Sequence, residues 1–180
     1  MTHTLPEQLR TAILNLLNHT DQQNRWPTPG DHAQHLDPRI QQTPALELID
    51  AAILKCLNTP DSRLIISMPP QEGKSQRVAI ATPIWQLHRD PDTRIAVASY
   101  AQGLANRNGR AIRNTIAAHP DLGRAIAHDN GAASEWTIAG HQGGVLSVGR
   151  GAGVTGRPAD LLIIDDPLKD RAEADSLTIR

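Results

Sequence analysis

The feature that most limits how this chain can fold is an alternation of short apolar runs with longer segments of helical periodicity. The apolar runs are RLIISM at 63–68, RIAVASY at 94–100 and DLLIID at 160–165, and helical segments at 74–88 and 101–118 lie between them. Strands that alternate with helices form right-handed crossovers in a parallel sheet with helices on both faces. The sequence therefore predicts an α/β fold with a mostly parallel sheet flanked by helices.

Residues 1–38 are expected to form an N-terminal helix and an irregular arm. Residues 5–18 have leucines and an isoleucine near a helical period, which predicts an amphipathic helix that packs on the main domain. Residues 19–38 contain prolines and a glycine among polar residues, a composition typical of a linker or an irregular arm.

Residues 39–180 are expected to form the domain itself. Thr43 is a suitable N-cap and Pro44 a suitable first helical residue, so a helix should begin there and end by residues 58–60. The segment EWTIAGHQGGVLSVGRG at 135–151 predicts an antiparallel hairpin before the last strand.

Length and composition are those of one soluble domain. The 180 residues include a single cysteine, Cys56, which excludes an internal disulfide. No apolar run reaches the ~18 residues that a membrane span needs. The formal net charge of −1 excludes a global basic field, so any contact with DNA must be local.

Two groups of side chains each leave two interpretations open. His32 and His35 are three residues apart, which fits either a shared metal ion or two solvated loop residues. Arg107, Arg110 and Arg113 advance in steps of three along the helix predicted at 101–118. They form either a local stripe for DNA phosphates or a solvated helix face.

The segment from Met68 to Ser75, MPPQEGKS, lies where a predicted strand ends and a predicted helix begins, the position of a phosphate-binding loop. A phosphate site needs N–H donors at a helix N-terminus, a long cation and, for Mg²⁺, a hydroxyl. Gly73, Lys74 and Ser75 supply these in order, although a Gly-Lys-Ser turn also occurs by chance. Nucleotide contacts are predicted from a continuous run of residues: Gln71, Glu72, Gly73, Lys74, Ser75 and Gln76.

This loop departs from the usual pattern G-x-x-x-x-G-K-[ST]. Met68 stands in place of the first glycine, and Pro69 and Pro70 have no N–H to donate. The amides that follow must therefore bind the phosphates. Glu72 adds a negative charge beside them, so its side chain is expected to point to water.

Two carboxylates, Asp165 and Asp166, directly follow the apolar run LLII. In nucleotide hydrolases an acid at this position coordinates Mg²⁺, and a second acid orients the attacking water. We therefore expect Ser75 and Asp165 to hold Mg²⁺, and Lys74 and Asp166 to act in catalysis. An acidic turn before Pro167 is the ordinary alternative for the pair taken alone.

Three stretches resemble the large terminase subunit of tailed bacteriophages, the ATPase and nuclease that packages viral DNA. They are MPPQEGKSQ, RIAVASYAQGLANRNGRAIRN and GGVLSVGRGAGVTGRPADLLIIDDPLKDRAEAD, within residues 40–180. The resemblance implies a P-loop ATPase of the additional-strand class that binds ATP and Mg²⁺ and works as a homo-oligomeric ring. It also implies double-stranded viral DNA, the portal protein and the small terminase subunit as partners, in the cytoplasm of a bacterial host.

Carried over residue by residue, the resemblance gives Lys74 the phosphate role and Ser75 the Mg²⁺ role. It makes Asp165 the metal carboxylate and Asp166 the catalytic acid, where many family members have Glu. Gln71 stands where members commonly have an arginine, which bears on the rate of hydrolysis more than on binding.

The resemblance also suggests residues outside these motifs. Gln41 or Gln42 lies where a glutamine that reads adenine is expected. Arg157 belongs to a Thr-Gly-Arg turn, where it either reaches a phosphate or a neighbouring subunit, or is an exposed turn arginine.

Family members have a further strand between the phosphate-loop strand and the acidic strand, followed by a nuclease domain. Nothing after Lys169 has the pattern of that strand. The resemblance thus implies a partial ATPase domain, incomplete at its C-terminal end, that cannot cut DNA and binds ATP weakly, if at all, as an isolated chain. Two other hypotheses remain, a helicase-like or repair ATPase of the same class and a non-catalytic terminase remnant that only binds partners.

Overall fold

The computed structural model describes residues 6–12, 25–152, 156–169 and 175, with the side chains of 129–131 left out. The helices are α2 (Pro29–Leu36), α3 (Pro44–Leu57), α4 (Thr82–Arg89) and α5 (Gln102–Ala118), together with the π-helix η1 (Gln76–Ala81) and the short 3-10 helix η2 (Pro120–Leu122). The strands are β1 (Arg94–Ser99), β2 (Ile126–Gly131), β3 (Glu135–Ile138), β4 (Gly144–Gly149) and β5 (Leu161–Ile164).

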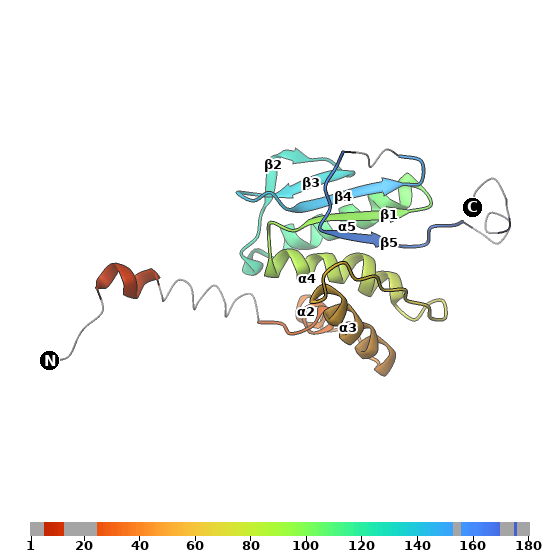
Figure 1. Cartoon of the computed structure of the whole chain (residues 1–180), viewed down its shortest axis with the longest axis horizontal. Helices are drawn as coiled ribbons and strands as arrows, with labels where there is room; N and C mark the ends of the chain where they lie inside the picture. The colour runs from red at the N-terminus through yellow and green to blue at the C-terminus, as the bar shows by residue number, and fades with distance from the viewer. Residues whose placement is uncertain (1–5, 13–24, 153–155, 170–174, 176–180) are drawn as a thin grey trace.

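The described strands form one five-stranded sheet in the order β2-β3-β4-β1-β5 (Figure 1). β1 pairs in parallel with both β4 and β5, whereas β3 pairs antiparallel with β2 and β4. The predicted α/β class is confirmed, but the sheet is mixed rather than mostly parallel. The antiparallel part contains β2, which the sequence did not predict, and the predicted hairpin of β3 and β4.

Several other predicted elements are confirmed. The second and third apolar runs are β1 and β5, and the predicted helices at 44–57 and 101–118 are α3 and α5. Thr43 caps α3, because its hydroxyl accepts a hydrogen bond from the Leu46 N–H, and Pro44 is the first helical residue. The predicted helix at 74–88 is also present, but its middle part is η1, a π-helix that periodicity did not reveal.

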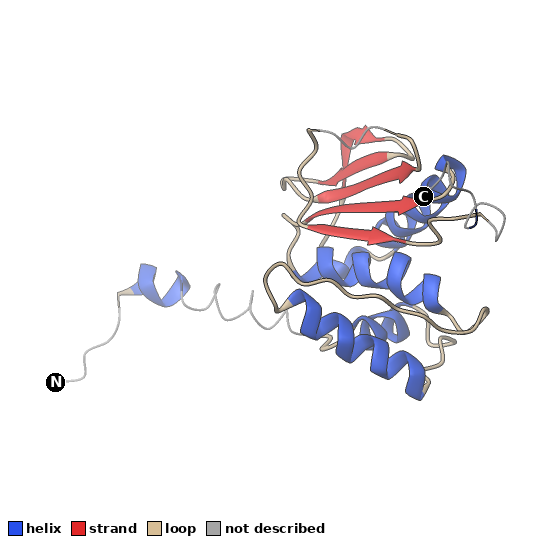
Figure 2. Cartoon of the chain, turned by 45° about the vertical axis from the view of Figure 1, so that its right-hand side comes forward, coloured by secondary structure: helices blue, strands red, loops and turns tan. Residues whose placement is uncertain are grey.

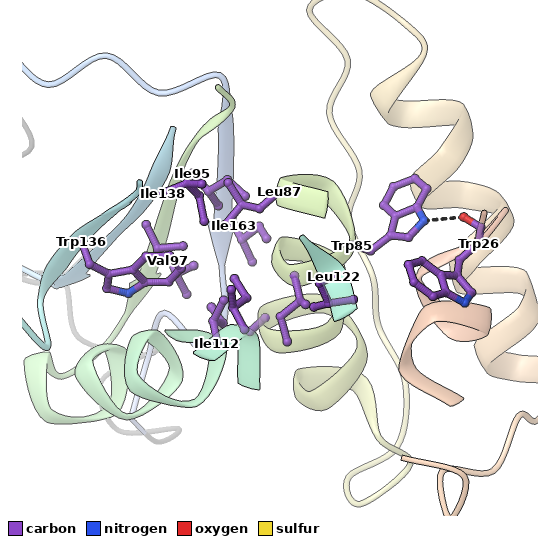
Figure 3. Close-up of a cluster of buried hydrophobic side chains, with 14 residues drawn as sticks. Trp26, Trp85, Leu87, Ile95, Val97, Ile112, Leu122, Trp136, Ile138 and Ile163 are labelled. Atoms are coloured by element: carbon purple, nitrogen blue, oxygen red, sulfur yellow. Dashed lines mark hydrogen bonds between the residues drawn. The ribbon is translucent and has the colours of Figure 1, made fainter. Parts of the chain in front are cut away.

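The helices α4 and α5 cover one face of the sheet (Figure 2). The strand register places Ile95, Val97 and Ile163 on that face, where they join Ile112 of α5 and Trp136 of β3 in the main core (Figure 3). The core also reaches Trp26, whose carbonyl accepts a hydrogen bond from the indole N–H of Trp85 at 2.8 Å. α2 and α3 form a further layer that packs on η1 and α4.

The opposite face of the sheet does not have the predicted helical cover within the described residues. Leu162 and Ile164 of β5 point to that face and are 57% and 59% exposed. Residues 156–159 cross part of it near β3 and β4 and line a shallow pocket there. The sheet is therefore packed on one side and largely open on the other at β5.

The predicted strand at 63–68 does not join the sheet, so this prediction is wrong for the described structure. The segment has no strand assignment, and Ile65 is 94% exposed. Ile66 and Met68 instead pack on the Leu46, Ile49 and Ile53 side chains of α3. A strand needs a neighbour for its N–H and C=O groups, and the described sheet ends at β5 without a strand between β5 and this segment.

The N-terminal part also differs from the prediction. Instead of an irregular arm, residues 29–36 form α2, which begins with a capping box between Thr28 and Asp31 and buries Gly30 and His32. Residues 7–12 are helical, as predicted for 5–18, but all of 6–12 are exposed, so the expected packing on the domain is not observed there. The rest of that predicted helix lies outside the described residues.

Candidate functional site

The predicted phosphate loop is a turn at residues 70–73 that leads directly into a helix starting at Lys74. Two of its residues have a positive φ, Gln71 at 66° and Gly73 at 83°. A left-handed conformation suits glycine but is uncommon for glutamine, and such backbone strain clusters at functional sites. The Arg77 N–H donates to the Gly73 carbonyl at 2.9 Å, so the loop carbonyl is tied to the first helical turn.

The two predicted halves of the site are in contact although 90 residues separate Ser75 from Asp165. The Ser75 hydroxyl donates to Asp165 Oδ1 at 2.9 Å. Lys74 Nζ lies 3.1 Å from Asp166 Oδ1 and 3.7 Å from Asp165 Oδ1. The lysine therefore stands between the two carboxylates, and the hydroxyl reaches the inner one.

Pairing with β1 places the two acids. β5 ends at Ile164, but the two acids continue its hydrogen bonding to the chain of β1. The Asp165 N–H donates to the Ala98 carbonyl at 2.9 Å, and the Tyr100 N–H donates to the Asp166 carbonyl at 3.0 Å. Asp166 has a φ of 49°, so the chain turns sharply at the second acid. Its side chain is 54% exposed, whereas that of Asp165 is 5% exposed.

This donor set fits Mg²⁺. The ion takes one or two carboxylates and completes its shell with waters and substrate phosphates, so Ser75 and Asp165 suffice as protein ligands. Among the described residues, no group of three or more His, Cys, Asp or Glu side chains is arranged to hold a metal. A Zn²⁺-type site, which relies on such a cluster, is not seen in that part of the chain.

The other predicted nucleotide contacts surround this centre. Gln71, Glu72 and Gln76 are exposed, and Glu72 thus lies at the surface, where its charge is solvated. Gln42 is not free to read a base in this structure, because its side chain bonds both Arg77 and Asp50. The resemblance had suggested Gln41 or Gln42 for this role, and Gln41 is exposed.

Other residues singled out in the sequence lie elsewhere. Arg157 forms an ion pair with Glu135 of β3. Arg107 and Arg110 are exposed on α5. Both a solvated helix face and a stripe for DNA phosphates require this exposure, so it does not decide between them. Arg113, the third of these arginines, is half-buried on α5 and thus less exposed than the other two.

The histidines His32 and His35 both lie in the helix α2 rather than in a loop, and His35 is exposed there, where it pairs with Asp121. His32 is fully buried, and its ring lies 4.5 Å from that of Trp26, which also contacts His35 and His88. Burial, and then the nearby His88, lowers the pKa of His32 from 6.5 to about 3. The neutral ring is therefore part of the packing between α2 and α4.

A cavity of about 520 Å³ lies away from the candidate site. It lies where β1 and β5 begin, between Arg89 and Asp90 near the end of α4, Leu57 of α3 and Asp160. The candidate site lies where the same two parallel strands end. Carboxyl ends of parallel strands are the usual place for ligands in α/β sheets.

The buried contact of Asp50 with Arg77, a residue of the helix that follows the phosphate loop, was not predicted from the sequence. No local pattern marks it, because the two residues come from separate helical segments.

Comparison with protein-family models found no match, and comparison with curated proteins found none either. None of the helices in the described residues is long and apolar enough to cross a membrane.

Proposed function

We propose that this chain is the N-terminal ATPase part of a phage DNA-packaging large terminase subunit, with the candidate site as its ATP and Mg²⁺ site. The observation that carries the proposal is the contact of Ser75 with Asp165 at 2.9 Å, next to Lys74 and Asp166. Two motifs far apart in sequence, each typical of nucleotide hydrolases, thus form one constellation at a strand end. The resemblance of three stretches to terminases supplies the particular class.

Each side chain has a role that follows from its position. Lys74 exchanges its contact with Asp166 for the β- and γ-phosphates of ATP, and the helix N-terminus adds N–H donors. Ser75 and Asp165 hold Mg²⁺, which neutralises the charge of the phosphates. Asp166 is the exposed acid of the pair, so it is free to orient a water for attack.

Gln71 in place of an arginine predicts slow turnover. An arginine near the γ-phosphate stabilises charge in the transition state, and glutamine has no charge to supply. Binding relies on the other residues and is affected less. This substitution also supports the second candidate, a terminase remnant that binds partners without hydrolysing ATP.

We further propose that the fold belongs to the additional-strand class and accepts another strand between β5 and residues 62–69. Support comes from the exposed apolar side chains on both sides of that position, Leu162 and Ile164 on β5 and Ile65 in the extended segment. Double-stranded viral DNA, the portal protein, the small terminase subunit and a homo-oligomeric ring are the proposed partners, in the cytoplasm of a bacterial host.

Titration of a fluorescent ATP analogue with Mg²⁺ tests the nucleotide site. We expect binding weaker than micromolar for the isolated chain, and a further loss of about tenfold or more for Lys74→Ala, because a hydrogen bond to a charged group contributes about 1.5–3 kcal/mol. Lys55→Ala is the matched control, since Lys55 is an exposed lysine on α3. Equal affinities for the three proteins would rule out this site, and phosphate release no faster than in Lys74→Ala would favour the remnant.

A further inference from the structure

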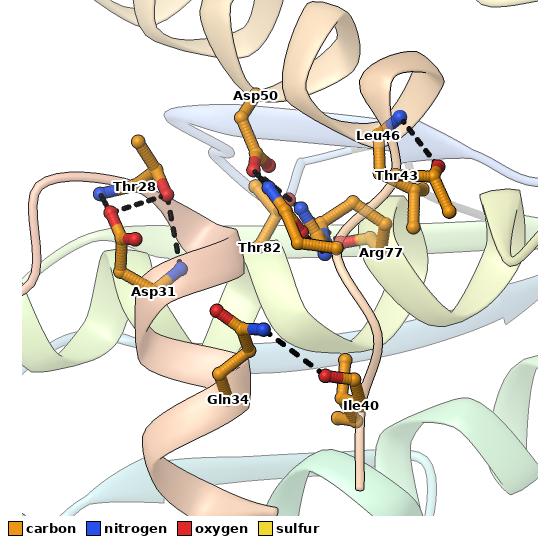
Figure 4. A network of polar contacts seen from close by, with 10 residues as sticks. Thr28, Asp31, Gln34, Ile40, Thr43, Leu46, Asp50, Arg77 and Thr82 are labelled. Atoms are coloured by element: carbon orange, nitrogen blue, oxygen red, sulfur yellow. Dashed lines mark hydrogen bonds and ion pairs between the residues drawn. The ribbon is translucent and has the colours of Figure 1, made fainter. Parts of the chain in front are cut away.

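An ion pair is buried at the start of the helix that follows the phosphate loop. Arg77 is 2% exposed and Asp50 1% exposed, and Arg77 Nη1 donates to Asp50 Oδ2 (Figure 4). Arg77 Nη2 donates to Gln42 Oε1 at 2.6 Å, and Gln42 Nε2 donates to Asp50 Oδ2 at 2.8 Å. We name these three residues the Arg77 triad. Each member bonds the other two, so the triad is closed.

Stability alone does not explain a buried pair of this kind. Removing two charges from water costs about as much as their attraction returns, and apolar residues of the same volume often stabilise a protein equally well or better. The best-attested use of such a pair is to fix one arrangement of the elements that carry it. The triad joins three segments, the loop before α3, α3 itself and η1.

The backbone of Arg77 connects the triad to the phosphate loop. Its N–H donates to the Gly73 carbonyl at 2.9 Å, one residue before Lys74. Its carbonyl accepts from the Thr82 hydroxyl at 2.9 Å and from the Thr82 N–H. That second bond spans five residues and belongs to the π-helix, a distortion frequent at functional sites. Arg77 thus ties the loop, the helix after it and α3 together.

α2 leaves room for the triad at Gly30. A Cβ on this residue would lie 2.5 Å from Arg77 Nη1 and 2.6 Å from Gln42 Nε2, and closer still to Asp50 Oδ2. Glycine costs up to about 1 kcal/mol relative to alanine in a helix interior, and Gly30 is in the first turn of α2. Its presence in α2 is explained by the lack of space for a Cβ beside all three members of the triad.

We infer that the Arg77 triad is a positioning device for the phosphate loop: it sets where Lys74 and Ser75 stand relative to Asp165 and Asp166. Its effect on nucleotide binding rests on the proposed function. Its effect on the loop does not, because the order of the loop is measurable without a nucleotide. Arg77 is therefore a positioning residue that acts through the loop.

The test compares Gly30→Ala with Gly103→Ala in the full chain. Gly103 is also in a helix, α5, but nothing lies within 4 Å of a Cβ added there. Amide hydrogen exchange of peptides spanning residues 70–80 is measured without nucleotide, with peptides of α5 as an internal reference. We expect exchange about tenfold faster in the loop peptides of Gly30→Ala alone, because local opening is reported by local exchange.

Loop exchange in Gly30→Ala equal to wild type overturns the inference. An increase spread evenly over the chain also overturns it, since that result shows a purely structural role. Gln42→Ala removes one member of the triad from a part-buried position, so it gives the same test should Gly30→Ala fail to fold.

Affinity for the fluorescent ATP analogue is the second readout. We expect it to fall about tenfold in Gly30→Ala relative to Gly103→Ala, in step with the change in loop exchange. Unchanged affinity in a variant with a loosened loop contradicts a role for the triad in binding. If the wild-type chain does not bind the analogue, the isolated chain has no working nucleotide site, and loop exchange alone then decides whether the triad positions the loop.

Discussion

The two faces of the sheet have different surroundings, and two neighbouring isoleucines of β5 show both. Ile163 is 6% exposed and belongs to the main core, whereas Ile164 is 59% exposed. The residue type and the strand are the same, so only the face differs. The described fold is therefore held together from the side of α4 and α5, while the other face contributes little at β5.

The candidate site lies across this boundary. Asp165 is buried beside the hydroxyl of Ser75, and Asp166 is exposed. The carboxylate expected to hold Mg²⁺ is thus fixed by the packed side of the protein. The acid expected to orient water is on the open side, where solvent enters.

Alanine substitutions at the two isoleucines give the largest expected effect. Ile163→Ala should lower the free energy of unfolding by about 3 kcal/mol, because it leaves a cavity in a packed core. Ile164→Ala should change it by less than about 0.5 kcal/mol, as exposed substitutions usually do. Equilibrium unfolding in urea measures both. Similar losses in the two variants would break the comparison between the faces.

Acid should weaken the packed side through His32, which is fully buried between α2 and α4. Its pKa is about 3 in the folded chain and 6.5 in the unfolded chain. Between these values the unfolded state binds more protons, so stability is lost as pH falls below 6.5, by up to about 1.4 kcal/mol per pH unit. The charged or titratable groups around it are His35, His88, His119 and Asp121.

Unfolding of His32→Leu and wild type from pH 7 to pH 4 isolates this contribution. The variant should lose less stability than wild type on acidification, since leucine takes up no proton in either state. His128→Gln is the control, because His128 is exposed on β2, and it should follow wild type. Parallel curves for His32→Leu and wild type would show that His32 is not the acid-sensitive group.

Part of this arrangement was predictable from sequence, because some signals are local. Lys74 and Ser75 begin a helix after a short turn, and the acid pair directly follows the apolar run of β5, so both motifs were recognisable from local sequence. The strand expected before Lys74 is not in the sheet, so the contact between the two motifs did not follow from the reason given for it. The helix α2 was missed although Thr28 and Asp31 carry its start signal, because the prolines and glycine around them also suit a loop.

Other features depend on which surfaces meet, and no local pattern encodes that. The apolar run at 63–68 indicated burial in the sheet, but Ile66 and Met68 are partly buried against α3 instead. The Arg77 triad unites residues from three segments. The spacing of apolar residues, from which helices and strands are predicted, does not reveal that a charged residue is buried. β2 has too few β-branched or aromatic residues to be recognised as a strand.

The smallest expected effect concerns the open side. Ile164→Lys should leave stability within about 0.5 kcal/mol of wild type. It should reduce self-association at high protein concentration, because an apolar residue on an unpaired edge strand promotes edge contacts and a lysine opposes them. Sedimentation velocity measures the association. Leu48→Lys is the matched control: Leu48 is 73% exposed but lies on α3, so association through the sheet should persist in that variant. If both lysines reduce association equally, general surface charge explains the effect, and the open side of β5 promotes self-association no more than the surface of α3.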